Sequence, residues 1–375
     1  MKPKTKRARQ MIDFRNDYSQ GTHQRVLDKL GQINMDQNPA YGQDSHCSAA
    51  LQWVREAVGM QRAALHFVSG GTQANLTVIS ALLRPHQGVI AADTGHISVH
   101  ETGAIEATGH KVLTLPGVDG KLTPDSVMRL VDAHTADENF EHTVQPGMVY
   151  ISNATELGTV YTREELKALS RACRKKGLAL YMDGARLGYA LESPLSDLSI
   201  ADIAGCCDVF TIGLTKQGAL FGEAIVVIGA ALQRDFRYLV KQRGGMLAKG
   251  WLMGAQFEAL MEDGLYFALA REAVRLAMLM KGKLLSLGVP LLCDSVSNQI
   301  FPVFSERVVS TLSARYGFNR VQAMDDGKVA VRFCTSWATK EKDVQSLLRD
   351  IEKAVAQDKP LALRDAGAPG VMQGI

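Results

Sequence analysis

The sequence lacks the signals of a secreted or membrane-spanning protein. The basic N-terminal residues are not followed by the apolar segment of a secretory signal. No apolar run approaches the roughly 20 residues that a membrane span requires. The six cysteines form no CxxC pair, and their simplest interpretation is reduced, mostly buried thiols. We therefore expect a cytoplasmic protein that has no membrane partner.

A strong charge of one sign is lacking as well. The net charge is only +3, and the basic residues of the first ten positions, MKPKTKRARQ, exceed that excess by themselves. The remainder is near neutral, which argues against a nucleic-acid partner. The histidines form no HExxH or other metal-ligand spacing, so we predict no metal site.

Short apolar runs instead alternate with amphipathic stretches through the middle of the chain. Most runs are typical of buried strands, because they are short, rich in Val, Ile and Leu, and bounded by Gly, Asp or Pro. This alternation predicts an α/β fold with a mostly parallel sheet covered on both faces. Only eight residues, Thr215–Gly222, separate the last two runs, so one of these strands should be antiparallel. The runs are 64–68, 89–92, 111–115, 148–152, 178–182, 209–214 and 224–228.

The length of the chain predicts more than one domain, because 375 residues exceed a single core of ~150 residues. We expect an N-terminal arm over residues 1–50, with its first ten residues disordered, and a large domain over 51–260. A smaller α+β domain over 261–356 and a tail over 357–375 should follow. The small domain should begin with a long amphipathic helix near 265–284.

Two reactive side chains follow neighbouring strands of the predicted sheet. Asp183 comes directly after the run 178–182, and Lys216 follows the next run, which ends at Leu214. The carboxyl ends of parallel strands meet at one edge of a sheet, so both side chains should face the same crevice. There a lysine can form a Schiff base with a carbonyl cofactor, and an aspartate can pair with a pyridinium nitrogen. Either residue alone would be better explained by an ordinary surface or turn-capping role, but the two together favour function.

The stretch Ser69–Asn75 follows a strand and opens a helix. Its glycines allow close backbone approach, and the helix N-terminus offers free N–H groups to a phosphate. Gly71 and Thr72 are the candidate contacts, although a plain strand-to-helix turn with Thr72 as N-cap is the alternative. No GK[ST] follows, so the stretch is not a Walker loop.

Two histidines and two arginines complete the candidates. His96 follows a strand and His142 precedes one, and an imidazole can stack on a pyridine ring or act as a general base. Arg186 and Arg332 carry the planar guanidinium that binds a carboxylate through two hydrogen bonds. The alternatives are structural histidines and, for Arg332, an interdomain salt bridge.

In combination these motifs resemble those of the fold-type-I pyridoxal-phosphate enzymes. In chain order they are SGGTQAN at 69–75, a GH pair at 95–96, DGARL at 183–187 and TKQGALFGEA at 215–224. The chain is most similar to the threonine aldolase and beta-eliminating lyase group, and the resemblance extends from Phe14 to Trp337. It implies a mostly parallel seven-stranded sheet flanked by helices, a smaller C-terminal domain and pyridoxal 5'-phosphate as cofactor.

The resemblance also implies a role for each candidate at the cofactor. Lys216 would carry the cofactor, Asp183 would pair with its pyridine nitrogen, and His96 would stack on its ring. Gly71 and Thr72 would hold its phosphate.

Further implied contacts concern an amino-acid substrate. Arg186, beside the cofactor, and Arg332 would clamp the substrate carboxylate, and His142 falls where the aldolases place a second active-site histidine. Tyr41, in the YGxD-like stretch Tyr41–Asp44, would reach into the substrate site of a neighbouring subunit. A homodimer or homotetramer with sites at the subunit interface is therefore expected.

Three stretches depart from the aldolase pattern. Ser152–Glu156 reads SNATE where the aldolases usually have Glu-Asn-Thr-His, on the substrate side of the ring. Asn16–Tyr18 replaces their Ser-Asp-Thr, and Arg243–Lys249 replaces their GGGMRQ. The first two departures concern substrate contacts, and the third concerns a phosphate contact across the subunit interface.

The expected function is aldol cleavage of a β-hydroxy-α-amino acid, such as threonine, to glycine and an aldehyde. The base that removes the hydroxyl proton is left open among His142, His96 and a bound water. Within the same cofactor class the alternative is β-elimination from, or transamination of, another amino acid. A non-catalytic binding protein on the same fold is a more distant alternative, against which Lys216, Asp183 and the two arginines argue together.

Overall fold

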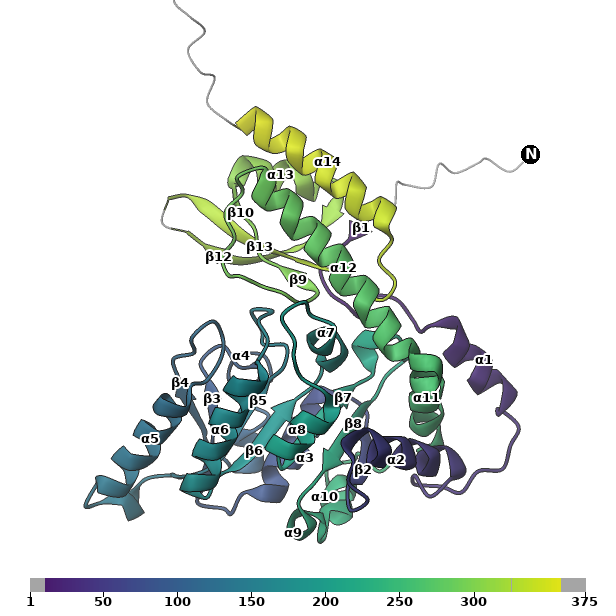
Figure 1. Cartoon of the computed structure of the whole chain (residues 1–375), viewed down its shortest axis with the longest axis vertical. Coiled ribbons are helices and arrows are strands. Elements are labelled where there is room, and N and C mark those ends of the chain that lie inside the picture. The colour runs from purple at the N-terminus through teal and green to yellow at the C-terminus, as the bar shows by residue number, and fades with distance from the viewer. Residues whose placement is uncertain (1–10, 325, 359–375) are drawn as a thin grey trace, which may run out of the picture.

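The chain folds into two lobes, which Figure 1 shows one above the other. The computed structural model describes residues 11–324 and 326–358, so the ten residues predicted to be disordered and nearly all of the predicted tail lie outside the described residues. The large lobe contains a seven-stranded sheet, and the small lobe contains a four-stranded sheet. This is the α/β architecture that the alternation of strands and helices predicted.

The large sheet has the strand order β2-β8-β7-β6-β5-β3-β4. Its members are β2 (Ala64–Val68), β3 (Gln87–Ala92), β4 (Val112–Leu115), β5 (Gln145–Ser152), β6 (Ala179–Asp183), β7 (Val209–Gly213) and β8 (Glu223–Val227). Strands β3 to β7 pair in parallel, whereas β8 is antiparallel to both β2 and β7. The prediction of an antiparallel strand after Thr215–Gly222 is therefore confirmed, because so short a connection cannot hold a helical crossover.

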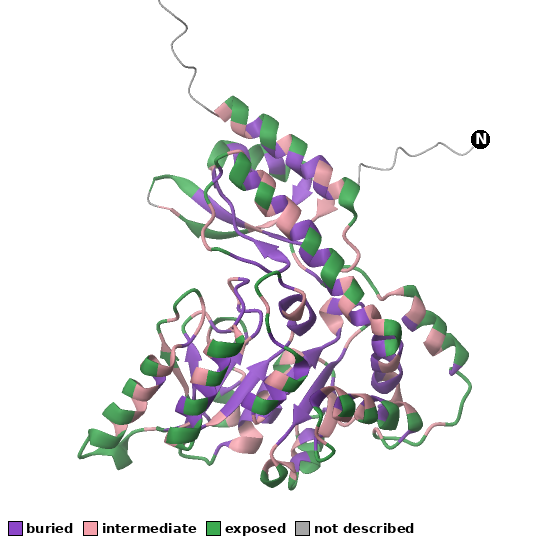
Figure 2. Cartoon of the chain, in the orientation of Figure 1, coloured by how far each residue is buried: buried purple, intermediate pink, exposed green. Residues whose placement is uncertain are grey.

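Helices cover both faces of this sheet, so its central strands are buried in Figure 2, whereas the edge strands β2 and β4 are mostly of intermediate exposure. One face packs against α3 (Gly71–Leu82), α4 (His96–Val99) and α10 (Phe236–Gln242). The other face packs against α2 (Ser45–Val58), α5 (Pro124–Ala136), α6 (Arg163–Lys176), α8 (Ile200–Cys206) and α11 (Trp251–Met261). Strands β7 and β8 are buried along their whole length, which explains their nearly uninterrupted apolar sequence.

The small lobe is built around the long helix α12 (Leu265–Ser286), which leaves the large lobe and runs into the small one (Figure 1). Its central strand is β13 (Lys328–Cys334), which pairs with β9 (Gln299–Ile300), β10 (Val303–Ser305) and β12 (Asn319–Ala323). Helices α13 (Glu306–Ser313) and α14 (Glu341–Asp358) complete the lobe.

The N-terminal arm contacts both lobes. Strand β1 (Ile12–Asp13) pairs with β11 (Tyr316–Gly317), and Phe14 is buried in the small-lobe core. Helix α1 (Gln24–Gln32) packs instead on α11 of the large lobe. The arm therefore crosses from one lobe to the other.

A buried ion pair lies where the arm crosses. Asp17 of the arm accepts hydrogen bonds from Arg186 Nε at 2.8 Å and from Arg186 Nη2 at 3.1 Å. Asn298 of the small lobe donates to the same carboxylate at 3.0 Å. Burial alone would raise the pKa of Asp17, but the positive charges of Arg186 and Lys216 and these hydrogen bonds outweigh burial and lower it. The arm, the large lobe and the small lobe thus meet at one charged group.

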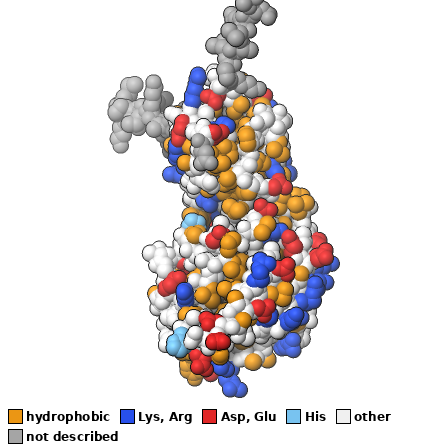
Figure 3. All heavy atoms as spheres, turned by 90° about the vertical axis from the view of Figure 1, so that its left-hand side faces the viewer, with side chains coloured by type: hydrophobic (Ala, Val, Ile, Leu, Met, Phe, Trp, Pro, Cys, Tyr) orange, Lys and Arg blue, Asp and Glu red, His pale blue; other side chains and the backbone are white. Residues whose placement is uncertain are grey.

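The apolar length of the helices and the distribution of charged side chains both agree with the amino-acid composition. None of the helices in the described ranges is long and apolar enough to cross a bilayer. Acidic and basic side chains both occur on each lobe of the face in Figure 3, as the small net charge of +3 would suggest.

Replacing Asp17 with Asn should destabilise the fold by about 3–5 kcal/mol at neutral pH, because the variant leaves the buried Arg186 guanidinium without a counter-charge. Urea unfolding followed by circular dichroism measures the change. Asp13→Asn is the matched control, since Asp13 and Arg15 form a solvent-accessible pair in the same arm. Its loss should cost at most about 1 kcal/mol.

The difference in unfolding free energy between the wild type and Asp17→Asn should depend on pH in a definite direction. Because the pKa of Asp17 in the folded protein lies below its ordinary value of 3.8, its stabilising contribution is complete above that value. The contribution is lost as the pH falls through the lower native pKa, so the wild type and Asp17→Asn should converge in acid. Equal stabilities at neutral pH would contradict the proposed importance of the ion pair.

Candidate active site

The candidate site is a cavity of about 180 Å³ at the carboxyl ends of β5, β6 and β7. The cavity brings together six of the predicted site residues, which are Gly71, Thr72, His96, Asp183, Arg186 and Lys216. Its remaining lining residues are Ser152, Ala154, Glu156 and Ala185. Parallel strands thus deliver the predicted groups to one edge of the sheet.

Asp183, the last residue of β6, is a buried carboxylate. It accepts hydrogen bonds from the Tyr150 hydroxyl at 2.7 Å, from Asn75 Nδ2 at 3.0 Å and from the Ala185 N–H at 2.9 Å. Burial alone would raise the pKa of Asp183, but the charge of His96 and these hydrogen bonds outweigh burial and lower it. The carboxylate is therefore held as an anion, which is the form that can pair with a protonated ring nitrogen.

Asn75 and Glu101 organise the groups around Asp183, and the sequence reasoning missed both. Asn75 on α3 also donates to Glu101 Oε1 at 2.6 Å and accepts from the Tyr181 hydroxyl at 2.7 Å. The same Glu101 oxygen lies 2.7 Å from His96 Nδ1. The only signal in the sequence was that Asn75 closes the glycine-rich stretch and that Glu101 follows His96 closely; neither residue type stands out by itself.

His96 begins α4 and lines the cavity. Burial would lower the pKa of His96, but the hydrogen bond with Glu101 and the charges of Glu156 and Asp183 outweigh burial and raise it. A raised pKa favours the protonated ring, with both nitrogens acting as donors. Its predicted stacking role stays a prediction.

Lys216 lies in the short 3-10 turn Thr215–Gln217, directly after β7. The turn is fixed on both sides, because the Tyr189 hydroxyl donates to the Lys216 carbonyl at 2.5 Å and the His23 N–H donates to the Gly218 carbonyl at 2.8 Å. The side chain of Lys216 lines the same cavity as Asp183.

The N-terminus of α3 forms a third side of the cavity. Its N-cap residue is Gly70, which has no side chain that could cap the helix. The first N–H groups of α3 therefore remain available to an anion, and the positive end of the helix dipole favours one. Gly71 and Thr72 line the cavity at this point, as a phosphate-binding role requires.

A second buried acid, Glu223, lies close to Lys216 and was also missed. It begins β8, where it pairs with Gly213 of β7, and it is 2% exposed. Burial and the negative charge of Asp183 raise the pKa of Glu223 to about 8, against the opposing effect of Lys216. Glu223 is therefore mostly uncharged at neutral pH and adds little negative charge beside Asp183.

The two predicted clamp arginines have different surroundings. Arg186 lines the cavity while it is paired with Asp17. Arg332 on β13 lies outside the lining; it donates to Gln299 Oε1 at 3.2 Å and to the Arg15 carbonyl at 3.3 Å. It forms no salt bridge with any residue that the structure describes, so the alternative role predicted for it has no support here. The clamp role of Arg332 stays a prediction.

The prediction of His142 as an active-site residue is wrong for this chain. His142 is an exposed residue of the 3-10 turn Phe140–His142, which precedes β5. The cavity lies beyond the opposite end of that strand, at Ser152. Parallel strands place their amino and carboxyl ends at opposite edges of a sheet, so His142 cannot reach the cavity of its own chain.

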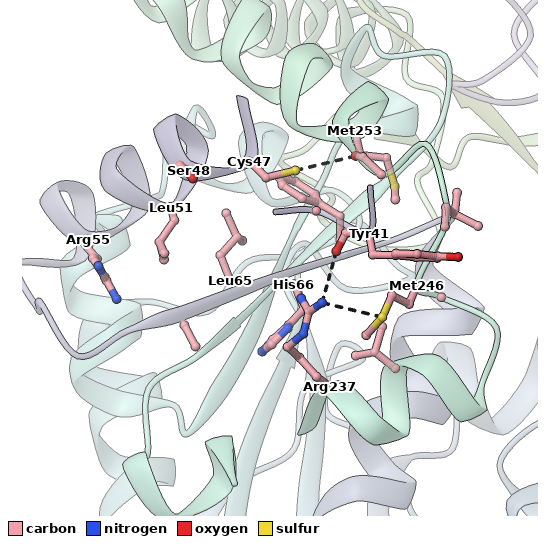
Figure 4. A pocket seen from close by; sticks show the side chains of 17 residues that line it. Tyr41, Cys47, Ser48, Leu51, Arg55, Leu65, His66, Arg237, Met246 and Met253 are labelled. Carbon is pink, nitrogen blue, oxygen red and sulfur yellow. Dashed lines mark hydrogen bonds between the residues drawn. The ribbon is translucent and has the colours of Figure 1, made fainter. Parts of the chain in front are cut away.

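Tyr41 lies in a separate cavity of about 240 Å³, shown in Figure 4. Its carbonyl accepts a hydrogen bond from Arg237 at 3.2 Å, and the Lys241 ammonium lies 4.8 Å from its ring centroid. Cys47 and His66 line the same cavity (Figure 4). The role predicted for Tyr41 concerns a neighbouring subunit, so it stays a prediction.

Comparison with known proteins places this chain in a family. The family model described as beta-eliminating lyase matches residues 13–356. The low specificity L-threonine aldolase of Pseudomonas sp. (strain NCIMB 10558) is 32% identical over 351 residues, which cover 92% of this chain and 99% of that protein. Its counterpart from Pseudomonas aeruginosa is 32% identical over 342 residues, which cover 90% and 96%.

Solved structures agree with this placement. The threonine aldolase of Leishmania major has 46% sequence identity and a TM-score of 0.89, with 92% of this chain and 99% of that chain covered. The aspartate aminotransferase of Thermus thermophilus, at 17% identity and a TM-score of 0.68 over 92% of this chain and 91% of that chain, shares the fold alone. These fold-type-I neighbours imply the use of pyridoxal phosphate. The protein is therefore an enzyme of the beta-eliminating lyase family.

Proposed function

We propose that the protein uses pyridoxal phosphate to cleave a β-hydroxy-α-amino acid, such as threonine, into glycine and an aldehyde. The observation that carries the proposal is the meeting of Lys216, ionised Asp183 and the open N-terminus of α3 in one cavity. The names of the relatives from Pseudomonas and Leishmania support the choice of substrate class.

The residues of the cavity fit the cofactor by their chemistry. Lys216 would hold its carbonyl carbon, Asp183 its ring nitrogen, and Gly71 and Thr72 its phosphate. His96 would lie against its ring. When bound, pyridoxal phosphate supplies a carbonyl that captures the substrate amino group and a ring that takes up an electron pair from the α carbon.

The chain itself would control three properties of the reaction. Asp183 keeps the proton on the ring nitrogen, because its own hydrogen-bond donors hold it as an anion. Arg186 orients the substrate carboxylate with Nη1, since Nε and Nη2 contact Asp17. Arg332 approaches the same carboxylate from the small lobe. Fixing the carboxylate also fixes which bond at the α carbon is aligned for cleavage.

We also propose that the protein acts in the cytoplasm as a homodimer or homotetramer. The support for an assembly is the exposed surface around Tyr41, where Tyr41 and Tyr238 are 43% and 77% exposed. Large exposed aromatic side chains are typical of interaction surfaces. In such an assembly Tyr41 would reach the site of the neighbouring subunit.

Product analysis tests the proposed reaction. The purified enzyme with pyridoxal phosphate should convert threonine to glycine and acetaldehyde, and Lys216→Ala should abolish this activity. Borohydride reduction followed by peptide mapping should place the pyridoxyl group on Lys216 in the wild type. Pyruvate or another keto acid in place of glycine and aldehyde would instead indicate elimination or transamination, and label on a different lysine would contradict the assignment.

Arg332→Lys tests the carboxylate clamp. Lysine keeps the charge but loses the two-pronged geometry, so substrate binding should weaken by about 2–4 kcal/mol. The KM for the amino acid should rise by a factor of roughly 30 or more, and kcat should also fall because the same contact orients the α carbon. The cofactor spectrum should not change.

Arg320→Lys is the matched control, because Arg320 is an exposed arginine on β12, opposite Val331 of β13, and pairs with Glu306. It should leave KM unchanged. If Arg332→Lys also keeps the wild-type KM, Arg332 does not bind the substrate carboxylate.

A further inference from the structure

We propose that Glu156 is the catalytic base that removes the proton from the β-hydroxyl group of the substrate. The inference rests on the proposed aldol cleavage and names the group that this reaction requires. Glu156 follows β5 at the carboxyl edge of the sheet and lines the cavity together with His96, Arg186 and Lys216.

The other ionisable groups of the cavity are unsuited to accept this proton. His96 would lie against the cofactor ring, and its Nδ1 is already 2.7 Å from Glu101 Oε1. Its raised pKa favours the protonated form, which has no free lone pair. Asp183 is engaged by three donors and would hold the ring nitrogen. Arg186 can only donate. Lys216 would be displaced from the cofactor by the substrate amino group and would lie beside that group rather than at the β-hydroxyl group. Glu156 is the remaining acceptor among the ionisable residues that line the cavity.

The carboxylate of Glu156 is not engaged elsewhere. Within the ranges that the structure describes, it forms no ion pair or hydrogen bond with another residue. It is nevertheless close to the two cationic groups of the substrate side. Burial lowers the pKa of both His96 and Arg186, and Glu156 is among the carboxylates that raise it. An uncommitted carboxylate beside the arginine that would orient the substrate is in position to receive a proton from it.

The loop that carries Glu156 is held firmly. The Thr155 N–H donates to the Thr159 carbonyl at 2.9 Å, and the Gly158 N–H donates to the Thr155 carbonyl at 2.9 Å. Val296 of the small lobe donates its N–H to the Gly158 carbonyl at 3.0 Å. The turn is thus anchored to both lobes, and a fixed base is what efficient proton transfer requires.

The step balances in atoms and electrons. Glu156 takes the hydroxyl proton, the O–H electron pair becomes the second bond of the aldehyde carbonyl, and the Cα–Cβ bond breaks. The electron pair of that bond remains with the α carbon, where pyridoxal phosphate would stabilise it when bound. A proton then returns to the α carbon and gives glycine, so one proton leaves the substrate and one is added.

Glu156→Gln tests the proposal, because glutamine keeps the size of the side chain but cannot accept a proton. The kcat for threonine cleavage should fall at least about 100-fold, with KM changed little. Glu156→Asp should recover part of the loss, because it restores a carboxylate. Glu141→Gln is the matched control: Glu141 is exposed in the 3-10 turn before β5 and should behave as the wild type.

A second readout separates a base from a merely structural residue. Glycine has no β-hydroxyl group, so exchange of its α proton in D₂O, followed by NMR, should proceed in Glu156→Gln at nearly the wild-type rate. Cleavage and exchange that fall together would overturn the proposal, as would a Glu156→Gln variant that cleaves threonine normally. A wild-type enzyme that cleaves no hydroxy amino acid would overturn the proposed function as well, so the two failures are distinguishable.

Discussion

The buried negative charge of Asp183 is the constraint on which the rest of the site depends. An ionised carboxylate inside a protein costs several kcal/mol unless charges and hydrogen bonds compensate for it. Tyr150 from β5, Asn75 from α3 and the ring of His96 provide this compensation, so three segments must meet at the end of β6. The strand order that sets β5 beside β6, with α3 across their face, satisfies that requirement. Without these partners the carboxylate would tend toward its neutral form and could not hold a ring proton.

A second buried charge couples the site to the arrangement of the lobes. The guanidinium of Arg186 is neutralised by Asp17, which belongs to the arm and also contacts Asn298 of the small lobe. The start of the same arm is buried in the small-lobe core at Phe14, and its later part contacts the turn of Lys216 through His23. The arginine that would orient the substrate is therefore fixed only when the arm lies between the lobes.

Local patterns were sufficient to predict the strands, the reversal before β8 and the meeting of Asp183 with Lys216, because strand ends and short connections leave direct signals in the sequence. Partners such as Asp17 and Arg186, 169 residues apart, leave none, since only the tertiary fold brings them together. The prediction for His142 was wrong for a reason that the sequence does contain: it precedes its strand and so lies at the edge away from the cofactor. Glu156, which follows the same strand, lies at the correct edge.

The placement of these charges also bears on specificity. In the proposed reaction Arg186 binds the carboxylate, Lys216 lies at the amino group and Glu156 takes the hydroxyl proton, and every β-hydroxy-α-amino acid has these three groups. None of these three groups lies beyond the β carbon, so the three side chains would not distinguish the substituent there. The other substrate-side residues, Ser152 and Ala154, are small, and an apolar contact distinguishes one methylene by only about 1–3 kcal/mol. In the proposed reaction, a site of this composition would therefore select the class of amino acid rather than one member.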